Sequence, residues 1–153
     1  MTPDTLFRIV NLVALPFWVL MVFAPRWRFT RRLMESMVGP GLFAVLYAVL
    51  VLPGLGAILP QLIRPELEAI VQLLSQPEAA VIAWIHFLAF DLFVGRWEYL
   101  DAQERGLSHL LLAPILVLTL MFGPLGLLAF LIARPRRAPE RKSLAHQAPA
   151  SSA

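Results

Sequence analysis

The sequence predicts an all-α integral membrane protein, a bundle of four transmembrane helices with a short amphipathic interfacial helix between spans two and three. Two observations predict this fold class. The 153-residue chain is 59% hydrophobic with a mean hydropathy of +0.72, above the roughly 45–50% apolar content of soluble domains. Its apolar residues also form uncharged runs long enough to cross about 30 Å of hydrocarbon. We expect one domain over residues 1–133 and a disordered basic tail over residues 134–153.

The first two spans are predicted from uncharged apolar runs. Residues Ile9 to Ala24 indicate a retained transmembrane helix and not a secretory leader, because no small-residue cleavage site follows them. The stretch from Ser36 to Ile63 has no charged residue and exceeds the roughly 20 residues that a span needs. We expect this second helix to start after Pro40 and to bend near Pro53, where proline and glycine cluster.

The connection between the second and third spans has helical periodicity. Its apolar residues fall at i, i+3, i+4 and i+7, with acidic and amide side chains between them, as in a helix lying on a membrane surface. These residues are Leu67, Ile70, Val71 and Leu74. Ser75 and Glu78 then match a capping box with Pro77 in the first turn, which predicts the start of the third helix.

The third and fourth spans differ in polar content. The third continues through a polar segment until Gly106, which we expect to cap its C-terminus. The fourth, from Leu107 to Ala133, has His109 as its one ionisable residue and contains Pro114 and a Gly-Pro-x-Gly pattern beginning at Gly123. Four alternating spans place the N-terminus, the amphipathic segment and the tail on one side of the membrane.

Charge does not fix the orientation of these spans. The basic residues of the +3 chain gather in two clusters, Arg26 to Arg32 and Arg134 to Lys142, which are typical of membrane flanks and not of a nucleic-acid surface. With four alternating spans the two sides carry seven and six basic residues, so only the first helix weakly favours a cytoplasmic position for the cluster that follows it. The chain has no cysteine, which excludes disulfides and cysteine-ligated metals.

The third span contains the candidate catalytic residues Asp91, His86 and Arg96. An ionisable side chain costs about 2.5–3.5 kcal/mol in a span and usually faces the bundle or a functional cavity. Asp91 and His86 could form a general acid and base at a lipid-accessible cavity, with Arg96 holding Asp91 or a polar group of the substrate. The alternatives are a structural hydrogen bond for Asp91, to Arg96, Arg8 or another helix, and a packing role for His86.

Aromatic side chains accompany these residues and are candidates for binding a flat apolar substrate, although such a stripe also suits helix packing. They are Trp84, Phe90, Phe93 and Trp97. Beyond them, a solvated and ion-paired face is predicted for Glu98, Asp101, Glu104 and Arg105. No metal or other cofactor is expected, because the spacing of His86, Asp91, Glu98, Asp101 and His109 matches no ligand signature.

Three segments resemble the abscisic-acid-deficient-four-like family, whose plant members are membrane proteins needed to convert violaxanthin into neoxanthin. The first is WIHFLAFDLFVGRW from Trp84 to Trp97, with Asp101 after it. The others are NLVALPFWVLMVFAPRW and MFGPLGLLAFLI, near the first and last spans. The resemblance covers about Leu6 to Ile132.

This resemblance implies a multi-pass protein that isomerises, or assists processing of, a carotenoid or isoprenoid lipid without a cofactor. The alternative is a non-catalytic membrane scaffold or accessory subunit whose basic tail binds anionic lipid. Membrane lipids are the expected partners, with homo-oligomers through the glycine and proline faces as a further expectation. The short N-terminus has no long transit segment, so we expect a bacterial cytoplasmic membrane.

Overall fold

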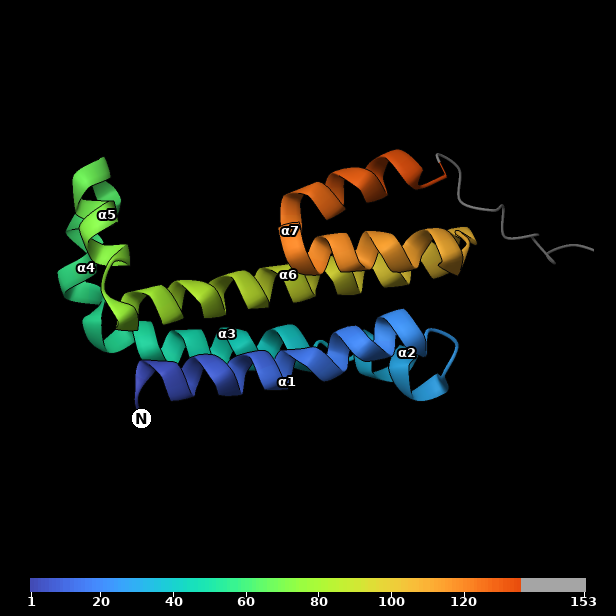
Figure 1. The fold of residues 1–153 in the computed structure, drawn as a ribbon, viewed down its shortest axis with the longest axis horizontal. Helices are drawn as coiled ribbons and strands as arrows, with labels where there is room; N and C mark the ends of the chain where they lie inside the picture. The colour runs from blue at the N-terminus through green and yellow to red at the C-terminus, as the bar shows by residue number, and fades with distance from the viewer. Residues whose placement is uncertain (136–153) are drawn as a thin grey trace, which may run out of the picture.

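The computed structural model describes residues 1–135, and within them the chain consists of helices and short connections (Figure 1). Four helical stretches are long and apolar enough to cross a membrane, which confirms an all-α membrane fold with four candidate spans: Pro3–Phe23, Val38–Gln61, Pro77–Arg105 and His109–Ala133. The elements are α1 (Pro3–Phe23), α2 (Arg28–Glu35), α3 (Val38–Val51), the 3₁₀ turn η1 (Leu52–Gly54), α4 (Leu55–Ile63), α5 (Leu67–Leu74), α6 (Pro77–Arg105) and α7 (His109–Ala133). Most of the predicted tail lies outside the described residues.

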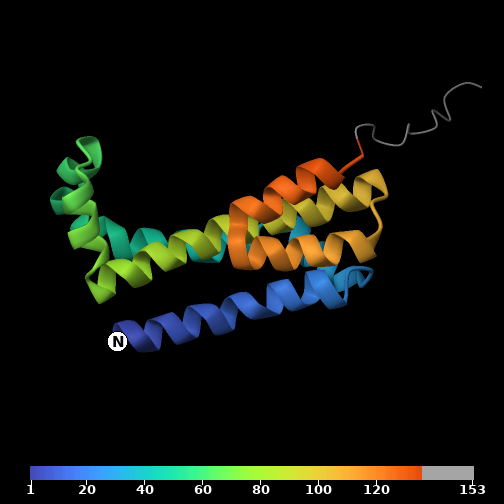
Figure 2. The same cartoon turned by 45° about the horizontal axis from the view of Figure 1, so that its top comes forward.

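Helix α6 is the centre of the bundle. Helices α1, α3 and α7 pack along it, and α2 and α5 contact it near its two ends (Figures 1 and 2). Helices α1 and α6 approach closely at Gly95, where a Cβ atom would lie 2.5 Å from the buried ring of Trp18 on α1. Gly39 similarly admits the ring of Phe17 and the side chain of Leu92. Small residues therefore allow the spans to pack closely, as is common for helices in lipid.

The outer surface of the bundle is apolar. Leu12 on α1 is 70% exposed, Val45 on α3 is 64% exposed, and Leu128 on α7 is 54% exposed. Monomeric soluble proteins rarely expose apolar surface this continuously. These side chains are suited to lipid, and the protein is a multi-pass membrane protein.

Several local predictions are confirmed. The second span passes through the 3₁₀ turn at Pro53, after which α4 turns away from the long axis of the bundle (Figure 1). Helix α5 has no buried residue, as expected for the amphipathic interfacial helix. Gly106 caps α6 with φ +69°, in the left-handed region that favours glycine.

Two local predictions need correction. The capping box is wrong, because Gln76 is the N-cap of α6 and makes no side-chain cap bond, while the Ser75 hydroxyl donates to Val71 O at 2.7 Å and closes α5. The basic segment after the first span is also more than a flank. It folds into α2, which is held by the buried Thr30, whose hydroxyl donates to Ala24 O at 2.8 Å.

Helix α7 does not run straight. Its backbone leaves helical geometry at Phe122 (φ −142°, ψ 41°) and Gly123 (φ 4°, ψ −75°). The second arm then runs back beside the first, so that α7 forms a helical hairpin (Figures 1 and 2). The first arm, to Met121, rises about 20 Å at 1.5 Å per residue, which is less than the roughly 30 Å of a hydrocarbon core.

The turn in α7 corrects the expected side of the C-terminal segment. Arg134 donates to Asp101 at 3.3 Å and Arg105 donates to Pro135 O at 3.2 Å, so both ends of α7 lie at the C-terminal end of α6. Within residues 1–135 that end holds Arg26, Arg28, Arg31, Arg32, Arg96, Arg105 and Arg134, whereas the opposite end holds Arg8 and Arg64. Connections rich in arginine and lysine stay on the side of the membrane where the chain is synthesised, which is the positive-inside rule. The rule therefore places the arginine-rich end on that side, called the insertion side below.

Single cysteines test this arrangement, since the chain has none of its own. Ser108→Cys and Pro135→Cys flank α7, and Gln76→Cys precedes α6; all three positions are exposed. We expect a membrane-impermeant maleimide to label the first two from the insertion side and the third from the other side. Labelling of Pro135→Cys together with Gln76→Cys would show instead that α7 crosses the membrane.

Candidate functional site

A cavity of about 670 Å³ lies between α6 and the turn of α7. It contains two titratable side chains, His86 and Asp91, among walls that are otherwise apolar. Its lining residues at the rim are exposed by 56–60%, and they are Phe87, Phe90, Met121 and Phe122. A rim of this kind in a membrane-spanning bundle opens toward lipid.

Asp91 stands against the break in α7. Its side chain is half-buried, and one carboxylate oxygen, Oδ1, lies where a side chain on Gly123 would begin. The second arm of α7 starts here at Pro124, and the first turn of a helix has free N–H groups and a partial positive charge. The end of that arm therefore favours an acidic group at this position. Within residues 1–135 Asp91 makes no ion pair.

His86 lines the same cavity but also packs among aromatic rings. The centroid of its imidazole lies 4.7 Å from that of Phe90 and 5.4 Å from that of Tyr47 on α3. The structure thus brings together two of the three candidate catalytic residues, Asp91 and His86, in one cavity.

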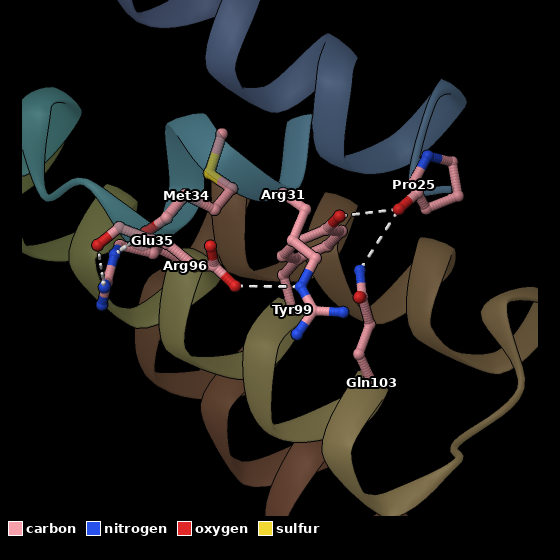
Figure 3. Close-up of polar contacts among 7 residues, drawn as sticks. All are labelled: Pro25, Arg31, Met34, Glu35, Arg96, Tyr99 and Gln103. Carbon is pink, nitrogen blue, oxygen red and sulfur yellow. Dashed lines mark hydrogen bonds and ion pairs between the residues drawn. The ribbon is translucent and has the colours of Figure 1, made fainter. Parts of the chain in front are cut away.

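Arg96 is placed elsewhere. Its guanidinium donates from Nε to Met34 O and from Nη2 to Glu35 O at 3.3 Å, and so binds the C-terminal end of α2 (Figure 3). The predicted pairing with Asp91 is therefore not present, because the guanidinium is bound to these backbone carbonyls of α2 instead. Arg96 joins α2 to α6 and does not reach the cavity wall.

Two further hydrogen bonds hold the same junction. The hydroxyl of Tyr99 and the amide of Gln103 both donate to Pro25 O, at 2.6 Å and 3.2 Å (Figure 3). On α2 itself, Arg31 donates to Glu35 at 2.9 Å, and this hydrogen bond with the carboxylate raises the pKa of Arg31. The polar residues at this end of α6 thus have a structural role.

The four candidate aromatic residues are divided among three places. Trp84 lines the cavity and donates to Asn11 Oδ1 at 3.2 Å. Phe90 lies between the cavity and a smaller apolar groove of about 280 Å³ between α3 and α6, which Phe93 also lines. Trp97 instead packs against Phe130, with ring centroids 5.2 Å apart, and under Arg134. Trp97 is therefore not part of the cavity.

Glu98 corrects the prediction of a solvated polar face. It is fully buried, and the Thr119 hydroxyl of α7 lies 2.8 Å from Glu98 Oε2 and 3.0 Å from Ile115 O. A hydroxyl has one hydrogen, so both contacts are hydrogen bonds when Glu98 carries a proton and donates it to Thr119. The sequence contains one indication of this burial. Glu98 lies seven residues after Asp91 and therefore on the same helical face as that membrane-embedded carboxyl group.

Of the remaining residues of that predicted face, Asp101 and Arg105 form the expected ion pair, although both are largely buried, and Glu104 makes no ion pair within residues 1–135. Arg105 donates to Asp101 at 2.7 Å, and Arg134 bonds the other oxygen of the same carboxylate. His109 lies apart from them, with Nε2 2.7 Å from Val22 O and Nδ1 buried without a partner among residues 1–135. In this part of the chain no three acidic or histidine side chains are close enough to hold a metal ion.

Substitution of Glu98 tests whether this side chain is protonated and donates a hydrogen bond to Thr119. Glu98→Gln keeps a donor toward Thr119, so we expect a change in unfolding free energy below about 1 kcal/mol. Glu98→Ala leaves a cavity and should cost about 2–5 kcal/mol. Thermal unfolding in detergent measures both, and equal losses from the two substitutions would contradict a proton on Glu98.

Substitution of Gly123 tests the contact between α7 and Asp91. Gly123→Ala places a Cβ atom on the Asp91 carboxylate, so we expect a loss of about 1–3 kcal/mol in stability. Gly41→Ala is the matched control, because nothing lies within 4 Å of the added atom there. Asp91→Ala removes the obstruction, so the double variant should lose less than the sum of the single variants. Additive losses would show that the two residues do not touch.

Comparison with known proteins identifies the family. A curated relative, the chloroplastic protein ABA DEFICIENT 4 of Arabidopsis thaliana, is 30% identical over 140 residues, which are 86% of this chain and 61% of the relative. The chain thus spans about three fifths of that relative's length. No solved structure matches the chain. The family model ABA DEFICIENT 4-like matches residues 5–130, including both arms of α7 and the whole of α6, so the chain belongs to the ABA4-like family.

Proposed function

We propose that this protein acts on a carotenoid or isoprenoid-like lipid inside the membrane, as a cofactor-independent isomerase that uses Asp91 and His86. One observation carries the proposal. The two titratable side chains of a lipid-facing apolar cavity are a carboxyl group and an imidazole, the pair that acid–base chemistry needs. Family membership supports a carotenoid-related substrate.

The cavity supplies the conditions for binding such a lipid. Aromatic and aliphatic side chains form its walls, and its open side meets the acyl chains, so an apolar ligand enters without crossing water. His86 and Asp91 lie about 7.5 Å apart along the axis of α6 and about 140° apart around it. An extended polyene end ring lying along the helix could contact both.

The proposed reaction opens an epoxide to an allene. Asp91 donates a proton to the epoxide oxygen as the carbon–oxygen bond breaks, leaving a hydroxyl. His86 accepts the proton lost from the adjacent polyene carbon, and the electrons of that carbon–hydrogen bond form the new double bond. One proton is given and one is taken, so the product is an isomer of the substrate and no redox partner is needed. The site is restored when His86 loses the proton it accepted and Asp91 regains one.

Asp91→Asn tests the role of the carboxyl group, because an amide keeps the shape but does not donate an acidic proton. In a host that makes carotenoids with epoxidised end rings, we expect the unsubstituted protein to give a new isomeric pigment peak. Asp91→Asn should lower that peak at least about a hundredfold, the usual contribution of a general acid. Pigment chromatography at matched membrane levels makes the comparison.

Asp4→Asn is the matched control, since Asp4 is exposed at the other end of the bundle and pairs only with Arg8 in the described chain. It should retain the wild-type peak. A peak that survives in Asp91→Asn would exclude Asp91 as the acid. Absence of any new pigment with the wild-type protein would contradict isomerisation of these epoxides.

A further inference from the structure

A second cavity, of about 560 Å³, lies at the arginine-rich end of the bundle, apart from the Asp91 cavity. The guanidinium groups of Arg26, Arg28 and Arg31 line one side of it. The other side is formed by the end of α6 and the start of α7, through Tyr99, Gln103, Gly106, Leu107, Ser108, His109 and Leu112. The cavity therefore joins a basic wall to a partly apolar one at the membrane surface.

The charge of the basic wall is only partly neutralised. Glu35 accepts a hydrogen bond from Arg31, but Arg26 and Arg28 make no ion pair within residues 1–135. Tyr99 and Gln103 use their donors on Pro25 O, which fixes the Pro25 backbone next to Arg26. Two exposed guanidinium groups are thus held beside a cavity with net positive charge.

The opposite wall adds unused polar groups. Ser108 is the N-cap of α7 and makes no side-chain cap bond, so its hydroxyl is not used within the helix. The Nδ1 atom of His109 is buried without a partner in the described chain. Because that atom is closed off from the cavity, the polar group that this wall offers to the cavity contents is the hydroxyl of the exposed Ser108.

We propose that this cavity binds a phosphate group carried at the membrane surface. Planar guanidinium groups match phosphate oxygens with paired hydrogen bonds. The cavity also continues into the apolar side chains of Leu107 and Leu112, which suits the first carbons of a lipid chain. The phosphate could belong to an anionic lipid headgroup or to a soluble phosphate compound, and the experiment separates these sources.

The test uses the full chain in nanodiscs of phosphatidylcholine, with either phosphatidic acid in the bilayer or inorganic pyrophosphate in the buffer. The site variant is Arg26→Gln with Arg28→Gln. The control is Arg8→Gln with Arg64→Gln, which removes the same charge from exposed positions at the other end. Retention of phosphatidic acid by native mass spectrometry reports the lipid arm, and isothermal calorimetry reports the pyrophosphate arm.

We expect the site variant to bind phosphatidic acid at least about tenfold more weakly than wild type, and the control to bind within twofold. Pyrophosphate binding with the same dependence on Arg26 and Arg28, without phosphatidic acid binding, would support the site and assign it a soluble ligand. An equal loss of ligand binding in the site variant and in the control would show that binding depends only on the net charge of the protein, and it would overturn the proposal. Unchanged binding of both ligands by the site variant would also overturn it, and matching thermal unfolding of the variants confirms that they fold.

Discussion

The break in α7 determines where the rest of the chain can lie. Backbone N–H and C=O groups in lipid need partners, so irregular backbone at membrane depth persists only against protein or polar groups. Here the break rests on α6 at Asp91, on a glycine that leaves room for the carboxylate. The second arm then returns to the side where α7 began, and its end is held by the pairs of Asp101 and Arg105. The lipid-facing cavity and the position of Arg134 at the arginine-rich end both follow from this turn.

The polar residues of helix α6 point in different directions around the helix axis. Asp91 and Glu98 share one face and meet the break and the first arm of α7 through Gly123 and Thr119, respectively. Arg96 points to α2, and His86 packs toward α3. A helix surrounded by five partners can thus contain several ionisable groups, because these groups are distributed over α2, α3 and different parts of α7. The residues at the C-terminal end stabilise the junction with α2, whereas those near the middle border the cavity.

Local features could be predicted from the sequence, and tertiary ones could not. The bend at Pro53 and the cap at Gly106 depend on a few neighbouring residues, so composition was enough to predict both. The Gly-Pro-x-Gly pattern of α7 is compatible with a kink or with a full turn, and only the contact with Asp91 decides between them.

The two main errors about the site have the same origin. Glu98 is followed by other charged residues and therefore resembled a solvated face, although its partner Thr119 is distant in sequence. Arg96 was paired with Asp91 by proximity along the chain, whereas its carbonyl acceptors on α2 belong to a helix that the basic segment did not reveal. Asp91 and His86 are candidates because an ionisable residue in an apolar run is costly and usually has a function, and their catalytic role stays a prediction.

The short arms of α7 also affect the surrounding bilayer. An arm of about 20 Å ends well inside hydrocarbon that is about 30 Å thick, while α6 continues beyond it. On the side of α6 that faces α7, the leaflet opposite the arginines therefore lacks protein along the segment from Trp84 to Phe90, and acyl chains must tilt or shorten to fill the space. This hydrophobic mismatch gives a rigid, flat lipid an advantage over a flexible acyl chain at that position, since it has less conformational entropy to lose. Membrane thickness and fluidity would then control occupancy of the cavity without any change in the protein.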